Sequence, residues 1–232
     1  MRPAPSLKSA ARALVLSGLT DKFYGLRQGT MQYMKLDNAD VKKAAAPLLR
    51  KLLTTEKSYA VQAEVLRALA KLKDKQDEKL FDKQLNSQSY AVQGAALAGL
   101  AAANPTAALA QARKLESSDN ANISQAVAGV YATSGGLPEW PKVRDKFKAA
   151  GPQAKFGMLQ SVVAMLGRID DVPAFTEGVN MMRDFNIKYK AQIGPNMAPV
   201  FQGLKQSKAS SANATTMQQV VDQAVAQIDA AK

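Results

Sequence analysis

The chain has 232 residues, of which 47% are hydrophobic and 6% aromatic, and its formal net charge is +12. It contains neither histidine nor cysteine, which excludes serine–histidine and cysteine–histidine relays, disulfides, thiolate metal sites and the H-E-x-x-H zinc motif. Carboxylate or lysine chemistry stays open, but we predict a chain that is not an enzyme and has no catalytic, cofactor or metal site of its own. Much of the hydrophobic share is alanine and leucine, which favours an all-α fold.

The positive charge is concentrated in the first third of the chain. Residues 1–83 hold 17 basic and 9 acidic side chains, whereas residues 84–136 are neutral. Such asymmetry indicates nucleic acid, an anionic surface, an acidic neighbouring domain or simply a soluble lysine-rich face. No apolar run approaches the ~20 residues of a membrane span. The basic N-terminal segment with Ala13–Leu16 has too short an apolar core for a signal peptide, so we predict an amphipathic helix there.

A five-residue pattern then recurs along the chain. Ser58–Gln62 (Ser-Tyr-Ala-Val-Gln) returns unchanged as Ser89–Gln93, a displacement of 31 residues. Further steps of 31 lead to Asn120 and Gly151, and Phe23–Arg27 matches the pattern at a displacement of 35. Each match opens a segment with apolar residues at spacings of three and four, which predicts a helix. We expect the side chains of the two serines and of the asparagine to cap these helices.

A second, shorter helix is predicted after each of these blocks, at residues 76–86, 105–116, 137–149 and 171–187. Two helices per ~31 residues predict a right-handed α-solenoid of antiparallel helix pairs. The alternative is a helical bundle with a chance pentapeptide match. We predict a repeat domain at residues 1–205, a polar linker at 206–216 and a C-terminal capping helix at 217–232.

The repeated unit resembles a short HEAT repeat. In that family a Val-Arg dipeptide, here Val61-Gln62, Val92-Gln93 and Leu26-Arg27, opens the second helix of each pair, and those helices line the concave face. The sequence Asp21–Arg27, followed by the Ser-Tyr-Ala-Val-Gln blocks, is similar to the C-terminal helical region of bacterial aminopeptidase N-type zinc metallopeptidases, over about residues 6–205. The zinc-binding and G-x-M-E-N motifs of that family are absent. The resemblance therefore implies an accessory part, with zinc only in a separate catalytic domain and a location in the bacterial cytoplasm or periplasm.

The candidate partner-binding residues are basic side chains of the first third, polar side chains on successive predicted helices and the single tryptophan. They are Arg27, Lys42, Lys43, Arg50, Lys51, Gln62, Arg67, Lys71, Gln93, Gln125, Trp140 and Lys155. An ordinary solvated face is the alternative for the polar set, and a staple over a helix start is the alternative for the tryptophan. For Tyr59 and Tyr90 we expect packing between repeats in preference to ligand stacking. For the paired acids near Asp37, Asp74 and Asp170 we expect helix capping in preference to cation binding.

The predicted function is a non-catalytic interaction domain that packs on the catalytic domain of an aminopeptidase N-type metallopeptidase. A stand-alone scaffold that binds protein or peptide is the first alternative. A HEAT-like DNA-binding protein or glycosylase is the second, and the neutral middle repeats disfavour it because a phosphate-binding groove needs converging cations.

Overall fold

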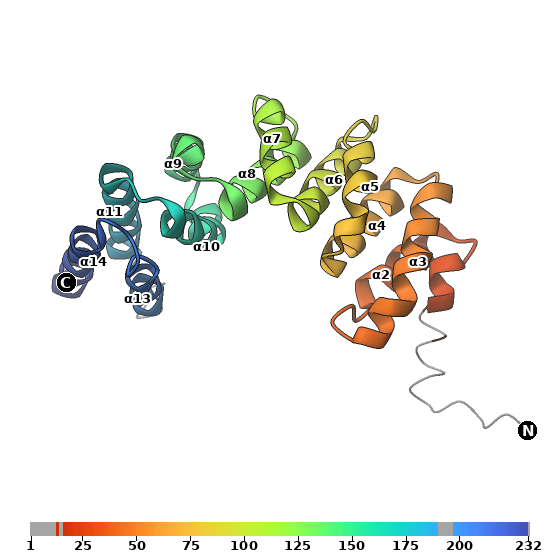
Figure 1. Ribbon diagram of the computed structural model, residues 1–232, viewed down its shortest axis with the longest axis horizontal. Helices are drawn as coiled ribbons and strands as arrows, with labels where there is room; N and C mark the ends of the chain where they lie inside the picture. The colour runs from red at the N-terminus through yellow and green to blue at the C-terminus, as the bar shows by residue number, and fades with distance from the viewer. Residues whose placement is uncertain (1–12, 14–15, 190–196, 232) are drawn as a thin grey trace, which may run out of the picture. The chain divides into compact units, whose positions relative to one another are not determined.

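The computed structural model describes residues 13, 16–189 and 197–231, and these residues form helices joined by turns, with no strand among them. The predicted all-α class is therefore confirmed. Residues 1–12 and 14–15 of the predicted N-terminal amphipathic helix lie outside the described residues. The chain divides into two compact units, Met1–Val130 and Tyr131–Lys232 (Figure 1).

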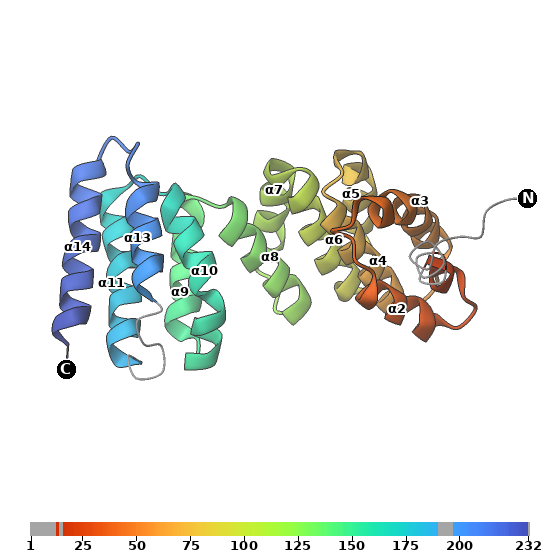
Figure 2. The same cartoon turned by 90° about the horizontal axis from the view of Figure 1, so that it is seen from below.

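The first unit contains α2, α4 and α6, the helices that begin with the repeated pattern, with α3 and α5 between them and α7 after α6. In chain order its elements are the 3-10 helix η1 (Gly18–Thr20), α2 (Tyr24–Tyr33), α3 (Ala39–Thr55), α4 (Tyr59–Leu72), the 3-10 helix η2 (Lys75–Asp77), α5 (Glu78–Gln84), α6 (Tyr90–Ala103), α7 (Pro105–Leu115) and most of α8 (Ala121–Ser134). Helices α2, α4 and α6 pack side by side in that order (Figure 2). The helix predicted at 105–116 is α7, and the one predicted at 76–86 is η2 with α5.

Small residues let the helices of the first unit approach closely. The apolar residues of α4 and α6 that recur at helical spacing are buried: Val61, Val65, Leu66, Leu69, Leu72, Val92, Ala96, Leu97 and Leu100. Between them Gly99 of α6 leaves room for the ring of Phe81, since an added Cβ would lie 2.2 Å from that ring. The contact between α5 and α6 therefore depends on the missing side chain.

The second unit has a core of larger side chains. Its elements after the end of α8 are the 3-10 helix η3 (Leu137–Glu139), α9 (Trp140–Ala149), α10 (Pro152–Arg168), α11 (Val172–Lys188), α13 (Ala198–Ser207) and α14 (Ala214–Ala230). Its buried aromatic residues are Tyr131, Trp140, Phe147, Phe175, Phe185 and Phe201. The helices predicted at 137–149 and 171–187 are present as η3 with α9 and as α11. Helix α14 packs on α11 and α13 with Met217, Val221 and Ala224 buried.

Two basic side chains hold helix ends together in the second unit. Lys208 is fully buried, and its Nζ donates to the carbonyl oxygens of Gly167 and Ile169 at 2.9 and 2.6 Å, at the end of α10. Burial lowers the pKa of Lys208, and Asp170 at 3.3 Å partly offsets this effect. Arg168 donates to the carbonyl oxygens of residues 131, 132 and 135, at the end of α8. These bonds satisfy carbonyl groups that have no partner within their own helices.

Candidate interaction surface

The same turn precedes α2, α4, α6 and α8. In each turn a side-chain oxygen accepts a hydrogen bond from the backbone N–H two residues later: Asp21 from Phe23 at 2.7 Å, Glu56 from Ser58 at 2.8 Å, Ser87 from Ser89 at 3.2 Å and Ser118 from Asn120 at 3.3 Å. The steps between these turns are 35, 31 and 31 residues, as in the sequence pattern. The predicted caps at Ser58 and Ser89 are wrong, because neither serine side chain makes a capping hydrogen bond. The polar side chain that fixes the turn lies two residues earlier.

A second hydrogen bond recurs one turn into each of α2, α4 and α6. Arg27, Gln62 and Gln93 occupy equivalent positions, and each side chain donates to the carbonyl oxygen six residues before it, at 2.7, 2.7 and 2.5 Å. All three were predicted to bind a partner. The structure gives them a local task, which is to hold the chain at the entry to each helix.

The starts of these helices lie on one side of the first unit. Arg27 of α2 also forms an ion pair at 2.6 Å with Glu56, which directly precedes α4. The side chain of Asn104, at the end of α6, donates to Glu78 at the start of α5. Since α5 follows the end of α4 closely, α4 and α6 end on the same side and therefore begin on the same side. At the next step, a Cβ on Gly94 of α6 would lie 2.7 Å from the carbonyl oxygen of Asn122 in α8.

A tyrosine is the first residue of α2, α4 and α6. Tyr24, Tyr59 and Tyr90 are 52%, 47% and 53% exposed. Tyr59 and Tyr90 were expected to pack between repeats. Packing covers only about half of each side chain, and the other half is exposed. Helix packing leaves these rings available to a partner.

The outward face of α2 is also apolar. Phe23, Leu26 and Tyr33 are 59%, 54% and 82% exposed. Leu26 and Tyr33 are two helical turns apart, and Phe23 precedes Leu26 by three residues, so the three lie along one side of the helix. This face was not predicted, because the segment Phe23–Arg27 was interpreted only as a match to the repeat.

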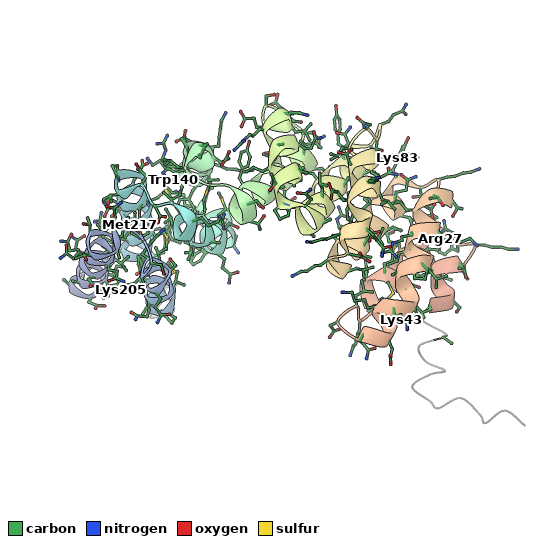
Figure 3. The ribbon with its side chains drawn as sticks, in the orientation of Figure 1. Arg27, Lys43, Lys83, Trp140, Lys205 and Met217 are labelled. Carbon is green, nitrogen blue, oxygen red and sulfur yellow. The ribbon has the colours of Figure 1, made fainter. Side chains whose placement is uncertain are left out.

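The basic residues predicted to bind a partner fall into two groups. Arg27 and Arg50 are committed to internal ion pairs, Arg27 with Glu56 and Arg50 with Asp74 and Asp77 at 2.8 and 2.6 Å. These hydrogen bonds raise the pKa of Arg50. Arg67 pairs with Glu64 one turn away and is 48% exposed. Lys42, Lys43, Lys51 and Lys71 are exposed, as is the uncharged Gln125, and Lys43 extends from α3 in Figure 3.

Several acidic residues do cap helices, as predicted. Asp74 accepts from the backbone N–H of Gln76 at the start of η2, and Asp171 accepts from that of Ala174 at the start of α11. In the cluster near Asp37, the cap is the neighbouring Asn38. Among the described residues, no group of three or more Asp, Glu, His or Cys side chains is arranged to hold a metal ion.

The predicted sites of the second unit lie around one groove. Trp140 is only 2% exposed, and its indole N–H donates to Glu177 at 3.3 Å, so it belongs to the core and not to a surface anchor (Figure 3). Lys155 lies over the ring of Phe147 at 5.6 Å.

The groove between α9 and α11 holds about 640 Å³. Its carboxylate Glu177 is bonded to Lys148 and Arg144, and these bonds, set against its burial, lower its pKa. A carboxylate held in this way is a poor general base at neutral pH.

Comparisons with known proteins leave the family open. No family model matches the chain, and no curated protein matches it. The crystal structure of an engineered protein solved by the Northeast Structural Genomics Consortium aligns with 95% of this chain and 97% of its own, at 19% sequence identity and a TM-score of 0.41. No helix among the described residues is long and apolar enough to cross a membrane.

Proposed function

We propose that the chain is a non-catalytic interaction domain that docks on another protein domain through the outward face of α2. The observation that carries this proposal is the exposure of Phe23, Leu26 and Tyr33 on one side of that helix. A contiguous apolar face exposed along one side of a helix indicates that another protein covers it.

The proposed scaffold consists of HEAT-like helix pairs stacked as a right-handed α-solenoid. The four equivalent turns, at steps of 35, 31 and 31 residues, support this architecture in the first unit. So does the hydrogen bond from Asn104 to Glu78, which brings the end of α6 to the start of α5, as the proposed antiparallel pair requires. Each pair leaves an apolar stripe that only its neighbours can bury, and α4 and α6 bury theirs against each other.

The proposed partner is the catalytic domain of an aminopeptidase N-type zinc metallopeptidase, and zinc would belong to that domain alone. This choice rests on the resemblance carried by Asp21–Arg27, and the apolar face of α2 begins within the same segment. A stand-alone scaffold for another protein is the remaining alternative. The nucleic-acid alternative is weaker, because Arg27 and Arg50 are paired with carboxylates inside the unit.

The test combines the chain with an aminopeptidase N-type catalytic domain encoded in the same genome and lacking its own helical C-terminal region. Sedimentation velocity would detect a complex, and hydrolysis of leucine p-nitroanilide would report activity. We expect a complex with raised activity, and we expect the double substitution Leu26→Ser and Tyr33→Ser to abolish it. The matched control is Leu137→Ser, which removes an exposed leucine of the second unit (46% exposed).

Two results would refute the proposal. One is the absence of any complex with the wild-type chain, and the other is a complex that the double variant forms equally well. Catalysis by the chain alone, with or without added zinc, would also overturn it.

A further inference from the structure

We infer that the starts of α2, α4 and α6 form a second binding surface, which holds an extended acidic segment of a partner protein. We call this surface the tyrosine edge and define it as Tyr24, Tyr59 and Tyr90 with Lys22 and Lys57. It goes beyond the proposed docking function, because the apolar face of α2 is made of different residues.

The tyrosines lie at the start of neighbouring helices on one side of the unit. The Arg27–Glu56 ion pair joins the starts of α2 and α4, and the Asn104–Glu78 hydrogen bond places the starts of α4 and α6 together. Each ring is about half exposed. Tyrosine is suited to such a surface because its ring adds a large contact area while its hydroxyl stays hydrated, at little cost in conformational entropy.

The spacing of the helices fits an extended polypeptide. Packed helices are roughly 8–10 Å apart, and an extended chain advances about 3.3 Å per residue. A peptide that crosses the three helix starts therefore meets a tyrosine at about every third residue. A folded helical partner, which advances only about 1.5 Å per residue, would have to span several turns to meet all three.

The charge of the edge selects an acidic segment. Lys22 and Lys57 are exposed, and each lies two residues before a tyrosine. Of the nearby carboxylates, Glu56 is paired with Arg27, whereas Asp21 keeps its charge and accepts from a backbone N–H, so Lys22 and Lys57 leave the edge with a net charge of +1. The positive ends of the helix dipoles add to the same sign.

A groove beside the edge extends its basic part. It lies between η1, the start of α2 and the second half of α3, holds about 500 Å³, and is lined in part by Lys51 and Lys57. At α6 the residue equivalent to the two lysines is Gln88, and before α8 it is the exposed Asp119. The acidic residues of the partner segment should therefore lie over α2 and α4, with a neutral stretch over α6.

The experiment presents the full chain to immobilised short peptides of random sequence, sorted into acidic, neutral and basic sets. We expect the strongest binding to the acidic set, and about a tenfold loss of affinity when Tyr59→Ser and Tyr90→Ser are combined. The substitution Lys57→Glu should move the preference toward neutral and basic peptides. Lys71→Glu is the matched control, since it makes the same charge change on an exposed lysine in the last turn of α4.

Three results would overturn the inference: equal binding to all three peptide sets, the same loss in Lys71→Glu as in Lys57→Glu, or displacement of the acidic peptides by a low concentration of duplex DNA. Circular dichroism would verify that each variant is folded. The variant Leu26→Ser with Tyr33→Ser should still bind acidic peptides, so failure of the edge and failure of the α2 face are distinguishable.

Discussion

The first unit exposes most of its aromatic side chains, with Phe81 as its buried exception, whereas the second unit buries most of its own. The described residues include eight large hydrophobic side chains that are exposed, and the first unit holds six of them: Phe23, Tyr24, Leu26, Tyr33, Tyr59 and Tyr90. The second unit instead buries its tryptophan and four phenylalanines in its core. Apart from Phe81, whose ring lies beside Gly99, the helices of the first unit pack mainly through alanine, glycine, valine and leucine. This difference indicates that the aromatic residues of the first unit serve contacts outside the unit.

The units also differ in where their buried polar bonds lie. In the first unit, Arg27, Gln62 and Gln93 secure the chain at the starts of helices. In the second, Lys208 and Arg168 secure the ends of α10 and α8. The first unit thus has a repeated, rigid entry to each helix, where its exposed tyrosines are found. The second has single long side chains that hold its fold together.

Among substitutions of polar residues and glycines, the largest expected effect is on the second unit, from Lys208→Ala. This change leaves the carbonyl groups of Gly167 and Ile169 without their donor and opens a cavity, so we expect it to cost about 3 kcal/mol of unfolding free energy. Urea unfolding followed by the fluorescence of Trp140 reports this unit directly, since the chain has one tryptophan. The control is Lys205→Ala in the last turn of α13, three residues before Lys208, where the lysine pairs with exposed Asp222. Equal losses in the two variants would mean that the buried bonds of Lys208 are not the source of stability.

A somewhat smaller effect is expected in the first unit, from Gly94→Ala. The added Cβ would meet the carbonyl oxygen of Asn122, which belongs to the backbone and cannot turn away, so we expect a loss of about 2 kcal/mol. Thermal unfolding by circular dichroism measures it. Gly29→Ala in α2 is the control, because nothing lies within 4 Å of its Cβ position. That variant should be unchanged or gain about 0.5–1 kcal/mol, and a stable Gly94→Ala would show that α6 and α8 do not approach so closely.

Next in size is the pH dependence of the Arg27–Glu56 pair. Burial acts to raise the pKa of Glu56, but hydrogen bonds from Ser58, Arg27 and Lys57 outweigh it and hold the pKa below its ordinary value of 4.5. The ionised carboxylate therefore stabilises the folded state above pH 4.5, and this contribution is lost as the pH falls through the lowered folded pKa. We expect Glu56→Gln to cost about 1.5 kcal/mol at neutral pH.

The measurement is the urea concentration at the midpoint of unfolding of the first unit, determined by circular dichroism at pH values from neutral to acidic. The difference between wild type and Glu56→Gln should shrink as the pH falls below 4.5. A difference that stays constant with pH would mean that Glu56 does not change its protonation with unfolding. Glu64→Gln is the comparison variant, since its ion pair with Arg67 is largely exposed and should contribute little.

Sequence periodicity predicted the helices well because their apolar stripes are simple. The buried positions of α4 and α6 and the bounds of α7 and α11 follow from spacing and proline positions alone. The candidate site was harder to predict, because exposure depends on which neighbour fills each space. Nothing local to Tyr59 distinguishes a packed ring from an exposed one.

The roles of polar residues were missed for the same reason. Gln62 and Gln93 look like surface residues in sequence, and only the turn that brings a carbonyl group six residues back toward them gives them a bond. Trp140 was a candidate anchor, with a staple over a helix start as the alternative, and the structure places it in the core beside Glu177. By contrast, the capping roles of Asp74 and Asp171 were predictable, since a cap depends only on the next few residues of the chain.

The smallest expected effect comes from Tyr33→Ser, and it tests the comparison most directly. Tyr33 is 82% exposed, so folding gains little from its ring, and we expect a change in stability within about 0.5 kcal/mol. Phe147→Ser in the second unit, where the ring is 2% exposed, should instead cost about 3–5 kcal/mol, near the loss for truncating a buried phenylalanine. If Tyr33→Ser destabilised the first unit by more than about 1 kcal/mol, its ring would be part of the fold. The contrast between exposed and buried aromatic residues would then not hold for Tyr33, the most exposed of them. The proposal that α2 presents its outward face to a partner would fail as well.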